Sequence, residues 1–532
     1  MGRLPTLQLN VIISGFDMTQ EVGPLIKSFY PGFDVTIRFL EEVSSILPNM
    51  PIKHIDGKIS ETTRDSENGT KGCAGSELGG DRAECLEISL ADTSFTITFN
   101  GKKENTTPFN YVDVPDEHMV YEKRKKRAYK NLLLKELYKV LSEKTGRTLP
   151  WGILTGVRPT KLLFERLKNG TVGNITYMTS EYLCSPRKAG LAQKTAAREL
   201  EILNRFDYKN GYSLYVGFPF CPSICNYCSF GSHPIDKFGD LVQAYIDVLL
   251  KEIDKTCRIL NGKKLQTIYF GGGTPTAVSA EQLKSVIERV KQSFDMSNVL
   301  EFTVEAGRPD SIDVEKLQML KDEGITRISI NPQSMCERTL ELIGRRHTAR
   351  QTVDAFNLAR SMGFDNINMD LIAGLTGESF SDMKYTLDEV GKLAPDCITV
   401  HTLALKRAAR LTTQKELYAG QEASDVEKMV DYAADFCMER GYEPYYLYRQ
   451  KNMTENLENV GYALPGKEGL YNILIMEEVQ QILALGAGAS SKFIDRNVTN
   501  GRRFGRIENV KNVSEYINRI DEMTERKLEC FK

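Results

Sequence analysis

The chain has 532 residues, of which 41% are hydrophobic and 26% are charged, and its formal net charge is -2. This composition is typical of a soluble globular protein, and the near-neutral charge excludes bulk attraction to nucleic acid. No apolar run reaches the roughly 18 residues of a membrane span, and the first residues lack the apolar core of a signal peptide. We therefore expect a cytoplasmic protein of two or three domains.

Alternating apolar residues predict β-strands in the first part of the chain. The alternation covers residues 7–13, 86–90 and 95–99. Residues 57–84 are rich in Gly, Ser, Thr, Asp and Glu, so burial cannot offset the entropy of ordering them, and we expect a disordered loop there. We predict an N-terminal α+β accessory domain over residues 1–165.

Helical patterns follow these strands. The basic run at 123–127 leads into apolar residues with helical spacing, and we interpret it as the solvated face of a helix. Residues 150–161 contain the only tryptophan, flanked by turn-forming residues, which indicates a buried turn between domains. We assign residues 166–210 to a helical connector.

Residues 211–410 alternate short apolar strands with helix-length segments, which is typical of a parallel βα-repeat domain. We count six units, two fewer than a closed barrel needs, and predict a partial (βα)6 barrel within an α/β fold. The strands are expected at 214–216, 267–270, 300–304, 327–330, 366–372 and 397–400. We predict that residues 411–532 form a C-terminal α+β domain that covers the mouth of the barrel.

Three cysteines follow the first of these strands, in the run Cys221-Pro-Ser-Ile-Cys225-Asn-Tyr-Cys228. Three thiolates can hold three irons of a [4Fe-4S] cluster and leave the fourth iron open to another ligand. One alternative is a zinc site completed by His233, although no second pair of closely spaced cysteines is present. A disulfide is a second alternative, but the chain has 11 scattered cysteines, and this odd number does not favour disulfide pairing.

Four other strands also end in residues that can bind ligands. These are Gly271–Thr274, Glu305, Asn331–Gln333 and Asp370. Because the carboxyl ends of parallel strands meet at one edge, we expect them to face the cysteine loop. No Gly-Lys-Ser/Thr follows the glycines, so they indicate close approach of a ligand to the backbone rather than a phosphate loop.

These motifs together resemble one enzyme family. Tyr215-Val-Gly-Phe-Pro-Phe-Cys221 with its two further cysteines, Gly271-Gly-Gly-Thr-Pro275 and Asn368-Met-Asp-Leu-Ile-Ala-Gly-Leu375 are similar to the radical S-adenosylmethionine (SAM) enzymes of the oxygen-independent coproporphyrinogen III oxidase family. Residues 150–161 and 446–452 resemble its longer HemZ-type branch, the coproporphyrinogen dehydrogenases. The resemblance covers most of the chain.

The resemblance implies a [4Fe-4S] cluster whose open iron binds SAM, and whose electron cleaves SAM to a 5'-deoxyadenosyl radical. The cluster ligands would be Cys221, Cys225 and Cys228. The residues that it assigns to SAM are Tyr215, Tyr227, Gly272, Gly273, Thr274, Glu305, Gln333, Arg345 and Asp370. Their types are suitable, because carboxylates accept hydrogen bonds from ammonium and hydroxyl groups and an arginine fork pairs with a carboxylate.

The family's reaction is part of heme biosynthesis. The radical removes hydrogen from a propionate of coproporphyrinogen III, loss of CO2 leaves a vinyl group, and two rounds give protoporphyrinogen IX. A low-potential one-electron donor such as flavodoxin or ferredoxin and a terminal acceptor are required. Cations that could meet this tetracarboxylate are Lys406, Arg407, Arg449 and Lys451, although as single residues they are more simply explained as surface charges.

A heme chaperone of the HemW type is the alternative, since it shares the SAM motifs. Phe230 stands where the best-attested oxidases have a further cysteine. The chaperone's His-Asn-x-x-Tyr-Trp segment reads Glu458-Asn459-Val-Gly-Tyr462-Ala463 here, so its histidine and tryptophan are missing. His347 and His401 are other imidazoles, which we interpret as structural. The sequence therefore favours the dehydrogenase.

Overall fold

The computed structural model describes residues 8–30, 33–40, 83–111, 121–228, 231–404, 425–449, 457–494 and 504–531. The predicted loop at 57–84 lies outside the described residues except for its last two, which begin a strand. Phe230, Lys406, Arg407 and Lys451 also lie outside them. Within the described ranges, no helix is both long and apolar enough to cross a membrane.

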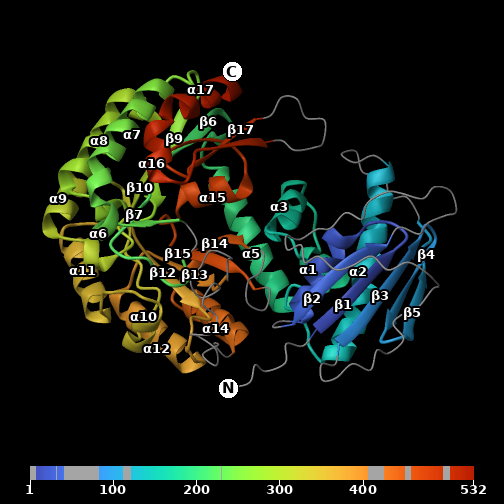
Figure 1. The fold of residues 1–532 in the computed structure, drawn as a ribbon. Coiled ribbons are helices and arrows are strands. Elements are labelled where there is room, and N and C mark those ends of the chain that lie inside the picture. The colour runs from blue at the N-terminus through green and yellow to red at the C-terminus, as the bar shows by residue number, and fades with distance from the viewer. Residues whose placement is uncertain are drawn as a thin grey trace, which may run out of the picture. The chain divides into compact units, whose positions relative to one another are not determined.

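The chain forms two compact units, residues 1–155 with 173–189, and residues 156–172 with 190–532 (Figure 1). The boundary between residues 155 and 156 falls inside the tryptophan segment, and Trp151 is buried. The helices of the predicted connector are α3 (Thr160–Lys168), α4 (Asn174–Tyr182) and α5 (Pro186–Leu203). The division into four domains with the boundaries given above remains a prediction.

The first unit is a five-stranded mixed sheet in the order β2-β1-β3-β4-β5 with helices. β1 pairs in parallel with β2 and β3, whereas β3, β4 and β5 are antiparallel. The elements are β1 (Gln8–Ser14), β2 (Asp34–Leu40), β3 (Ala83–Ala91), β4 (Ser94–Phe99), β5 (Lys102–Pro108), α1 (Thr19–Phe29) and α2 (Tyr121–Thr145). The three predicted strands are confirmed, and the alternation of β1 buries Leu9, Val11 and Ile13.

The second unit is built on an eleven-stranded sheet that contains the predicted partial barrel. Seven consecutive strands of it are parallel, and the six of them that were predicted are confirmed. In spatial order they are β6 (Gly211–Phe218), β9 (Lys264–Gly272), β10 (Glu301–Glu305), β11 (Arg327–Ser329), β12 (Ile367–Ala373) and β13 (Cys397–Thr402). The described strands do not close into a ring, as expected for six units.

Strands from the C-terminal part of the chain extend this sheet at both edges. β15 pairs antiparallel with β13 and β14, and β16 pairs in parallel with β6 and antiparallel with β17, which is followed by β18. Their bounds are β14 (Glu443–Tyr448), β15 (Asn459–Ala463), β16 (Gln481–Leu485), β17 (Ser490–Ile494) and β18 (Phe504–Glu508). The C-terminal strands therefore belong to the barrel's own sheet.

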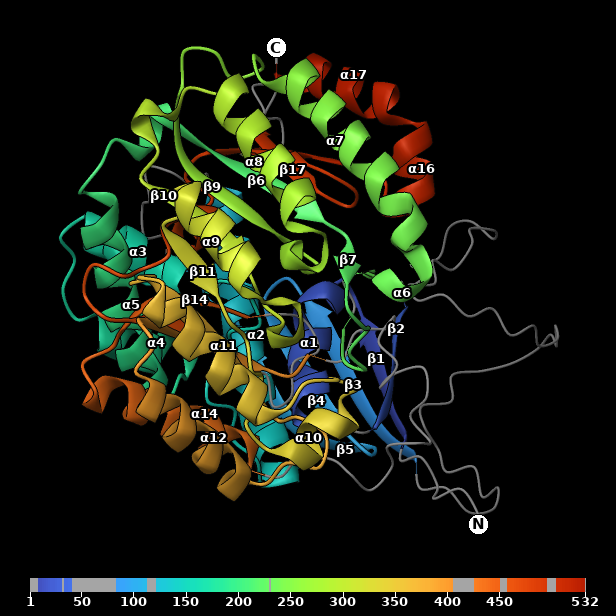
Figure 2. The same ribbon diagram turned by 90° about the vertical axis from the view of Figure 1, so that its left-hand side faces the viewer.

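A layer of amphipathic helices covers the outer face of the parallel strands (Figure 2). They are α7 (Val242–Thr256), α8 (Ala280–Ser293), α9 (Val314–Asp322), α11 (Ala349–Ser361) and α12 (Phe380–Leu393). In α8 the buried residues Leu283, Val286, Ile287 and Val290 follow the helical period. Ser279 and Gln282 cap its first turn reciprocally, which satisfies backbone donors there, and α11 and α12 begin in the same way.

The two faces of the parallel strands carry different side chains. Toward the helices they are apolar, as with Ile268 and Phe270 of β9. Toward the interior they are polar and bond between strands: Thr267 donates to Ser213 at 2.7 Å, and Thr399 donates to Asn368 at 3.0 Å. Residues on this face include Ser213, Tyr215, Thr267, Tyr269, Glu301, Glu305, Asn368, Asp370, Thr399 and His401. The barrel therefore has a polar interior suited to a polar ligand.

Candidate functional site

The cysteine loop leaves the carboxyl end of the first parallel strand. Cys221 ends the short strand β7 (Phe220–Cys221), which pairs with β8 (His233–Pro234). The loop is held at Asn226, whose backbone and side-chain nitrogens donate to Ile343 O at 2.8 Å and Leu342 O at 2.9 Å. These acceptors lie at the end of α10 (Glu337–Leu342), so the segment that follows the fourth parallel strand, β11, holds the loop.

Each of the three cysteine sulfurs has a polar neighbour. Thr274 Oγ1 lies 3.5 Å from Cys221 Sγ, and Arg308 Nη1 lies 3.6 Å from Cys225 Sγ. Ser232 Oγ lies 3.9 Å from Cys228 Sγ. None of the three cysteines forms a disulfide, so that alternative is wrong. Hydrogen bonds to sulfur are a common feature of iron-sulfur sites, and this donor set fits three thiolate ligands.

The described residues contain no group of three or more His, Cys, Asp or Glu side chains arranged around one metal ion. Three cysteines that each bind a different iron of a cluster do not need to converge in that way. His233, the fourth ligand of the zinc alternative, is partly buried, and burial lowers the pKa of its ring. Its backbone nitrogen donates to Pro219 O at 2.7 Å, which holds it in the β7 and β8 pair.

The glycine run after β9 packs against the start of the cysteine loop. Gly273 N donates to Phe218 O at 2.6 Å, and a Cβ on Gly273 would lie 2.5 Å from Phe220 O. Gly272 has φ of +106°, which favours glycine. The close approach is thus between two parts of the chain, and it places Thr274 beside Cys221. The sequence predicted that a ligand approaches the glycine backbone closely, but it did not show that the start of the cysteine loop makes such an approach.

A hydrogen-bonded pair lies at the ends of β9 and β10. Tyr269 donates to Glu305 Oε1 at 2.5 Å. Burial raises the pKa of Glu305 to about 7, and the Asp370 carboxylate adds to this, while the hydrogen bond from Tyr269 opposes it. The Tyr269 ring stacks with Tyr215 and Tyr471, at centroid distances of 6.2 Å and 4.5 Å, and these two rings lie 6.3 Å from each other. Glu305 can therefore exchange a proton near neutral pH.

Asp370 of β12 also lies on the inner face of the barrel, and its pKa is shifted in the opposite direction to that of Glu305. Asn368 donates to its Oδ1 at 2.7 Å, and His401 Nε2 lies 3.8 Å from its Oδ2. Although burial opposes it, His401 and Asn368 hold the pKa of Asp370 below its usual value. The barrel mouth thus combines an ionised carboxylate with one that titrates near pH 7, an arrangement suited to ammonium and hydroxyl groups.

Arg345 lies against the backbone just before Gln333, in the segment after β11. Gln333 has φ of +66°, and its buried Oε1 has no hydrogen-bond partner. Arg345 donates to Asn331 O, to Pro332 O at 3.1 Å and to Gly307 O at 3.2 Å, while its Nε has no partner. The two terminal nitrogens of the guanidinium therefore support the loop, whereas Nε has no partner.

Tyr227 packs on an apolar cluster next to the cysteine loop. The cluster consists of Leu340, Ile343, Ile372, Leu375 and Leu403. Burial raises the pKa of Tyr227, and the neighbouring Cys225 adds to the effect. This side of the loop is therefore apolar, with Tyr227 partly buried against the cluster.

Arg308, which the sequence interpretation did not select, lies against the cysteine loop and carries Asp310 as its ion-pair partner. Arg308 pairs with Asp310 through Nε to Oδ1 at 2.9 Å and Nη2 to Oδ2 at 2.8 Å. Arg308 Nη2 also lies 3.0 Å from Ser223 Oγ. The available signal was the Gly307-Arg-Pro-Asp310 run only two residues after Glu305.

The remaining candidates are buried. His347 is 2% exposed, neither ring nitrogen has a hydrogen-bond partner, and burial with the charge of Arg345 lowers its pKa to about 3. Arg449 is also buried, and its backbone nitrogen donates to Val157 O at 2.7 Å. Glu458 is fully buried, and its backbone oxygen accepts a hydrogen bond from Thr402 Oγ1 at 2.8 Å.

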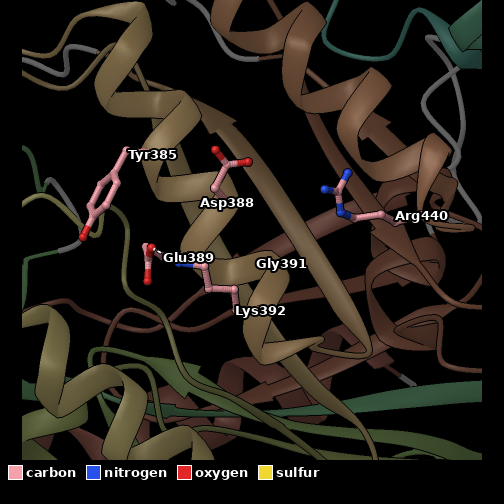
Figure 3. A pocket seen from close by; sticks show the side chains of 6 residues that line it. All are labelled: Tyr385, Asp388, Glu389, Gly391, Lys392 and Arg440. Atoms are coloured by element: carbon pink, nitrogen blue, oxygen red, sulfur yellow. Dashed lines mark hydrogen bonds and ion pairs between the residues drawn. The ribbon is translucent and has the colours of Figure 1, made fainter.

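A surface hollow of about 510 Å³ lies away from these residues (Figure 3). It lies between the last turns of α12 and the end of α14 (Val426–Glu439). Its lining is Tyr385, Asp388, Glu389, Gly391, Lys392 and Arg440. Because α12 leads into β13, this hollow is at the amino ends of the strands, opposite the cysteine loop. It contains none of the predicted site residues.

Comparisons with known proteins agree with these features. A family model described as the radical SAM superfamily matches residues 215–390. The chain is 41% identical over 459 residues to the oxygen-independent coproporphyrinogen-III oxidase-like protein HemZ of Bacillus subtilis, across 84% of this chain and 90% of that protein. It is 31% identical over 280 residues to the heme chaperone HemW of Lactococcus lactis, across 52% of this chain and 69% of HemW.

Among solved structures, coproporphyrinogen III oxidase (HemN) from Escherichia coli, described as a radical SAM enzyme, is similar with a TM-score of 0.48 and 22% identity. The match covers 59% of this chain and 70% of HemN.

Proposed function

We propose that this chain, which belongs to the radical SAM superfamily and within it to the HemZ-like coproporphyrinogen oxidase-like proteins, is an oxygen-independent coproporphyrinogen III dehydrogenase. The reaction converts two propionates of coproporphyrinogen III to vinyl groups with loss of CO2, and gives protoporphyrinogen IX. Members of this superfamily use a [4Fe-4S] cluster and SAM. We place the reaction in the cytoplasm.

The observation that carries this proposal over a chaperone is the position of Glu458. The chaperone's segment has histidine there, whereas this chain buries a carboxylate at the start of β15. The backbone of Glu458 accepts from Thr402, and Asn459 Oδ1 accepts from Thr402 N at 2.8 Å. The segment therefore fastens β13 to β15, which is a structural role that does not require a heme ligand.

Cys221, Cys225 and Cys228 are the proposed cluster ligands. The reduced cluster would supply the single electron that cleaves the sulfonium of SAM. The polar neighbours of the three sulfurs support thiolates, and Tyr227 with its apolar cluster would exclude water on one side. A dry site strengthens every charge interaction within it.

The proposed SAM site is the barrel mouth next to this loop. Asp370 and ionised Glu305 would accept hydrogen bonds from the amino or hydroxyl groups of SAM, and Arg345 Nε would donate to its carboxylate. The unpaired Oε1 of Gln333 is a further acceptor. Tyr215, Gly272, Gly273 and Thr274 would shape the wall between this site and Cys221.

The substrate and the redox partner complete the proposal. A tetracarboxylate needs cations, and Arg449 at the end of β14 is the described candidate, with Lys406, Arg407 and Lys451 outside the described residues. β14 runs in the same direction as β13, so its end lies at the same edge of the sheet as the carboxyl ends of the parallel strands. A low-potential one-electron donor such as a flavodoxin or ferredoxin would reduce the cluster.

A heme chaperone is the second candidate function, supported by the similarity to HemW. His401 is a partly exposed imidazole at the barrel mouth that could approach a porphyrin. In this case SAM cleavage would be uncoupled from decarboxylation.

One experiment separates the two functions. Anaerobically reconstituted protein is given SAM, dithionite, an electron acceptor and coproporphyrinogen III, and heme binding is titrated in parallel. We expect protoporphyrinogen IX and two molecules of CO2 for each substrate consumed. Stoichiometric heme binding with SAM cleavage but without CO2 would contradict the dehydrogenase and support the chaperone.

A further inference from the structure

We infer that Arg308 is a positioning residue of the iron-sulfur centre, which holds Cys225 in place and, balanced by Asp310, sets the reduction potential of the cluster. The inference concerns the cofactor of the superfamily and does not depend on which substrate the protein uses. It rests on the contacts of Arg308 with the cysteine loop and with Asp310.

Arg308 spans the first turn of the cysteine loop. Its Nη1 lies 3.6 Å from Cys225 Sγ and 3.3 Å from Ser223 O, and its Nη2 lies 3.0 Å from Ser223 Oγ. The residue is 3% exposed, so these contacts are shielded from water. One planar guanidinium thus joins the backbone, a hydroxyl and a cysteine sulfur of the loop.

Asp310 fixes the other edge of the same guanidinium. The pair is bidentate, with distances of 2.9 Å and 2.8 Å, which is the strong geometry for arginine and a carboxylate. Asp310 also neutralises part of the charge that Arg308 presents to the sulfur. The net charge at Cys225 is therefore set by the balance between two side chains on one short segment.

The other titratable groups near this pair are Arg345 and His347. Both act on Asp310 electrostatically, as does Arg308. His347 is buried among these charges and stays neutral at physiological pH, so it does not add a further cation. The cationic side of the site therefore consists of the two arginines, of which Arg308 lies 3.6 Å from the sulfur of Cys225.

A cation at this position favours the reduced cluster. Three thiolates make the cluster anionic, and one electron from an external donor makes it more so, which a nearby guanidinium stabilises. The potential of an iron-sulfur cluster depends on net charge, hydrogen bonds to sulfur and exposure, and Arg308 contributes to all three. Removal of its charge should lower the potential, and removal of the opposing Asp310 charge should raise it.

The test is an anaerobic redox titration of reconstituted protein, followed by electron paramagnetic resonance, without coproporphyrinogen. We expect Arg308→Gln to lower the midpoint potential by at least a tenfold change in the reduction equilibrium, about 59 mV for one electron. Asp310→Asn should shift it the other way. Arg308→Lys, which keeps the charge, should stay closer to the wild-type potential than Arg308→Gln.

A matched control is the pair of Arg360 and Asp396, whose Nη1 and Oδ2 lie 2.7 Å apart near the amino ends of the strands. Arg360→Gln should leave the potential unchanged. Shifts of the same sign in Arg308→Gln and Asp310→Asn, or no shift in either, would overturn the inference. If Arg308→Gln does not retain iron, the Asp310→Asn variant alone tests the inference. A higher midpoint potential would support it, and a lower or unchanged potential would overturn it.

Since the titration contains no tetrapyrrole, its outcome is independent of the proposed dehydrogenase activity. If the protein proves inactive with coproporphyrinogen III, the opposite shifts of the midpoint potential in Arg308→Gln and Asp310→Asn are still expected.

Discussion

The hydroxyl of Tyr269 lies 2.5 Å from Oε1 of Glu305, so a tyrosine at the end of one parallel strand holds a carboxylate at the end of the next. Burial would otherwise drive the pKa of Glu305 higher than about 7, because the hydrogen bond from Tyr269 favours the ionised carboxylate. The protonation of Glu305, and with it the charge of the proposed SAM site, thus depends on this contact.

Tyr269→Phe should therefore move the pH dependence of SAM binding. If ionised Glu305 binds SAM, affinity in the wild type rises as pH increases through about 7. Without the tyrosine hydroxyl, the pKa of Glu305 rises and the transition moves to higher pH. Isothermal titration of SAM binding at several pH values measures this shift.

Tyr471→Phe is the matched control for that change, because the Tyr471 ring stacks on the Tyr269 ring with centroids 4.5 Å apart. It should leave the transition close to its wild-type pH. An unshifted transition in Tyr269→Phe would contradict the assigned role of the pair.

Glu305→Gln should stabilise the fold at alkaline pH. Folding raises the pKa of Glu305 from 4.5 to about 7, so its ionisation costs stability progressively as pH rises through this window. The amide cannot ionise, so the variant should gain on the order of 1 kcal/mol or more in the free energy of unfolding at pH 8 relative to pH 5. Urea unfolding at both pH values, without SAM, provides the measurement.

Asp370→Asn should behave in the opposite way. Its pKa is lowered from 3.8 by folding, so the ionised carboxylate stabilises the native state above this pH. The variant should be less stable than wild type at pH 7, and the difference should shrink as pH falls below about 4. A stability loss that is independent of pH would indicate a packing effect instead.

Cys225→Ala should remove the cluster and all SAM cleavage. A [4Fe-4S] cluster with two remaining cysteines lacks a ligand for one of three bound irons. The measurements are the iron content after anaerobic reconstitution and the release of 5'-deoxyadenosine. Cys257→Ser, at the end of α7, is the control and should keep both. A full iron complement in Cys225→Ala would rule out this ligand set.

Gly273→Ala should disturb the cysteine loop from the neighbouring strand. The added Cβ would lie 2.5 Å from Phe220 O and 3.1 Å from Cys221 Sγ, so the two backbones must separate. We expect a destabilisation of roughly 1–3 kcal/mol together with weaker iron retention. Gly190→Ala, in a helix with open space around the Cβ, should be neutral or slightly stabilising. Thermal unfolding and iron analysis of both variants test this.

The strands and the cysteine loop were accessible from the sequence because their signals are local. Apolar alternation spans a few neighbouring residues, and the three cysteines lie within eight positions of each other. The shared mouth of the barrel followed from the same patterns, since parallel strands must end on one edge. The six parallel strands were predicted in this way, and the structure confirms them.

Partners that come from distant segments were not accessible in this way. Arg308 contacts Cys225 across 83 positions of sequence, and no local pattern links the two. Arg345 was expected to bind a carboxylate, yet most of its fork donates to backbone carbonyls of the loop after β11. Its residue type indicated what it can bind, but the neighbouring backbone decides what it does bind.

The sequence by itself determined the six-stranded plan and the chemistry of three clustered thiols, because both depend on residue type and short spacing. Only the tertiary structure decided the donor beside each sulfur, the tyrosine that holds Glu305 and the different protonation of Glu305 and Asp370. These properties depend on distance and burial, which arise only when separate strands and helices pack together.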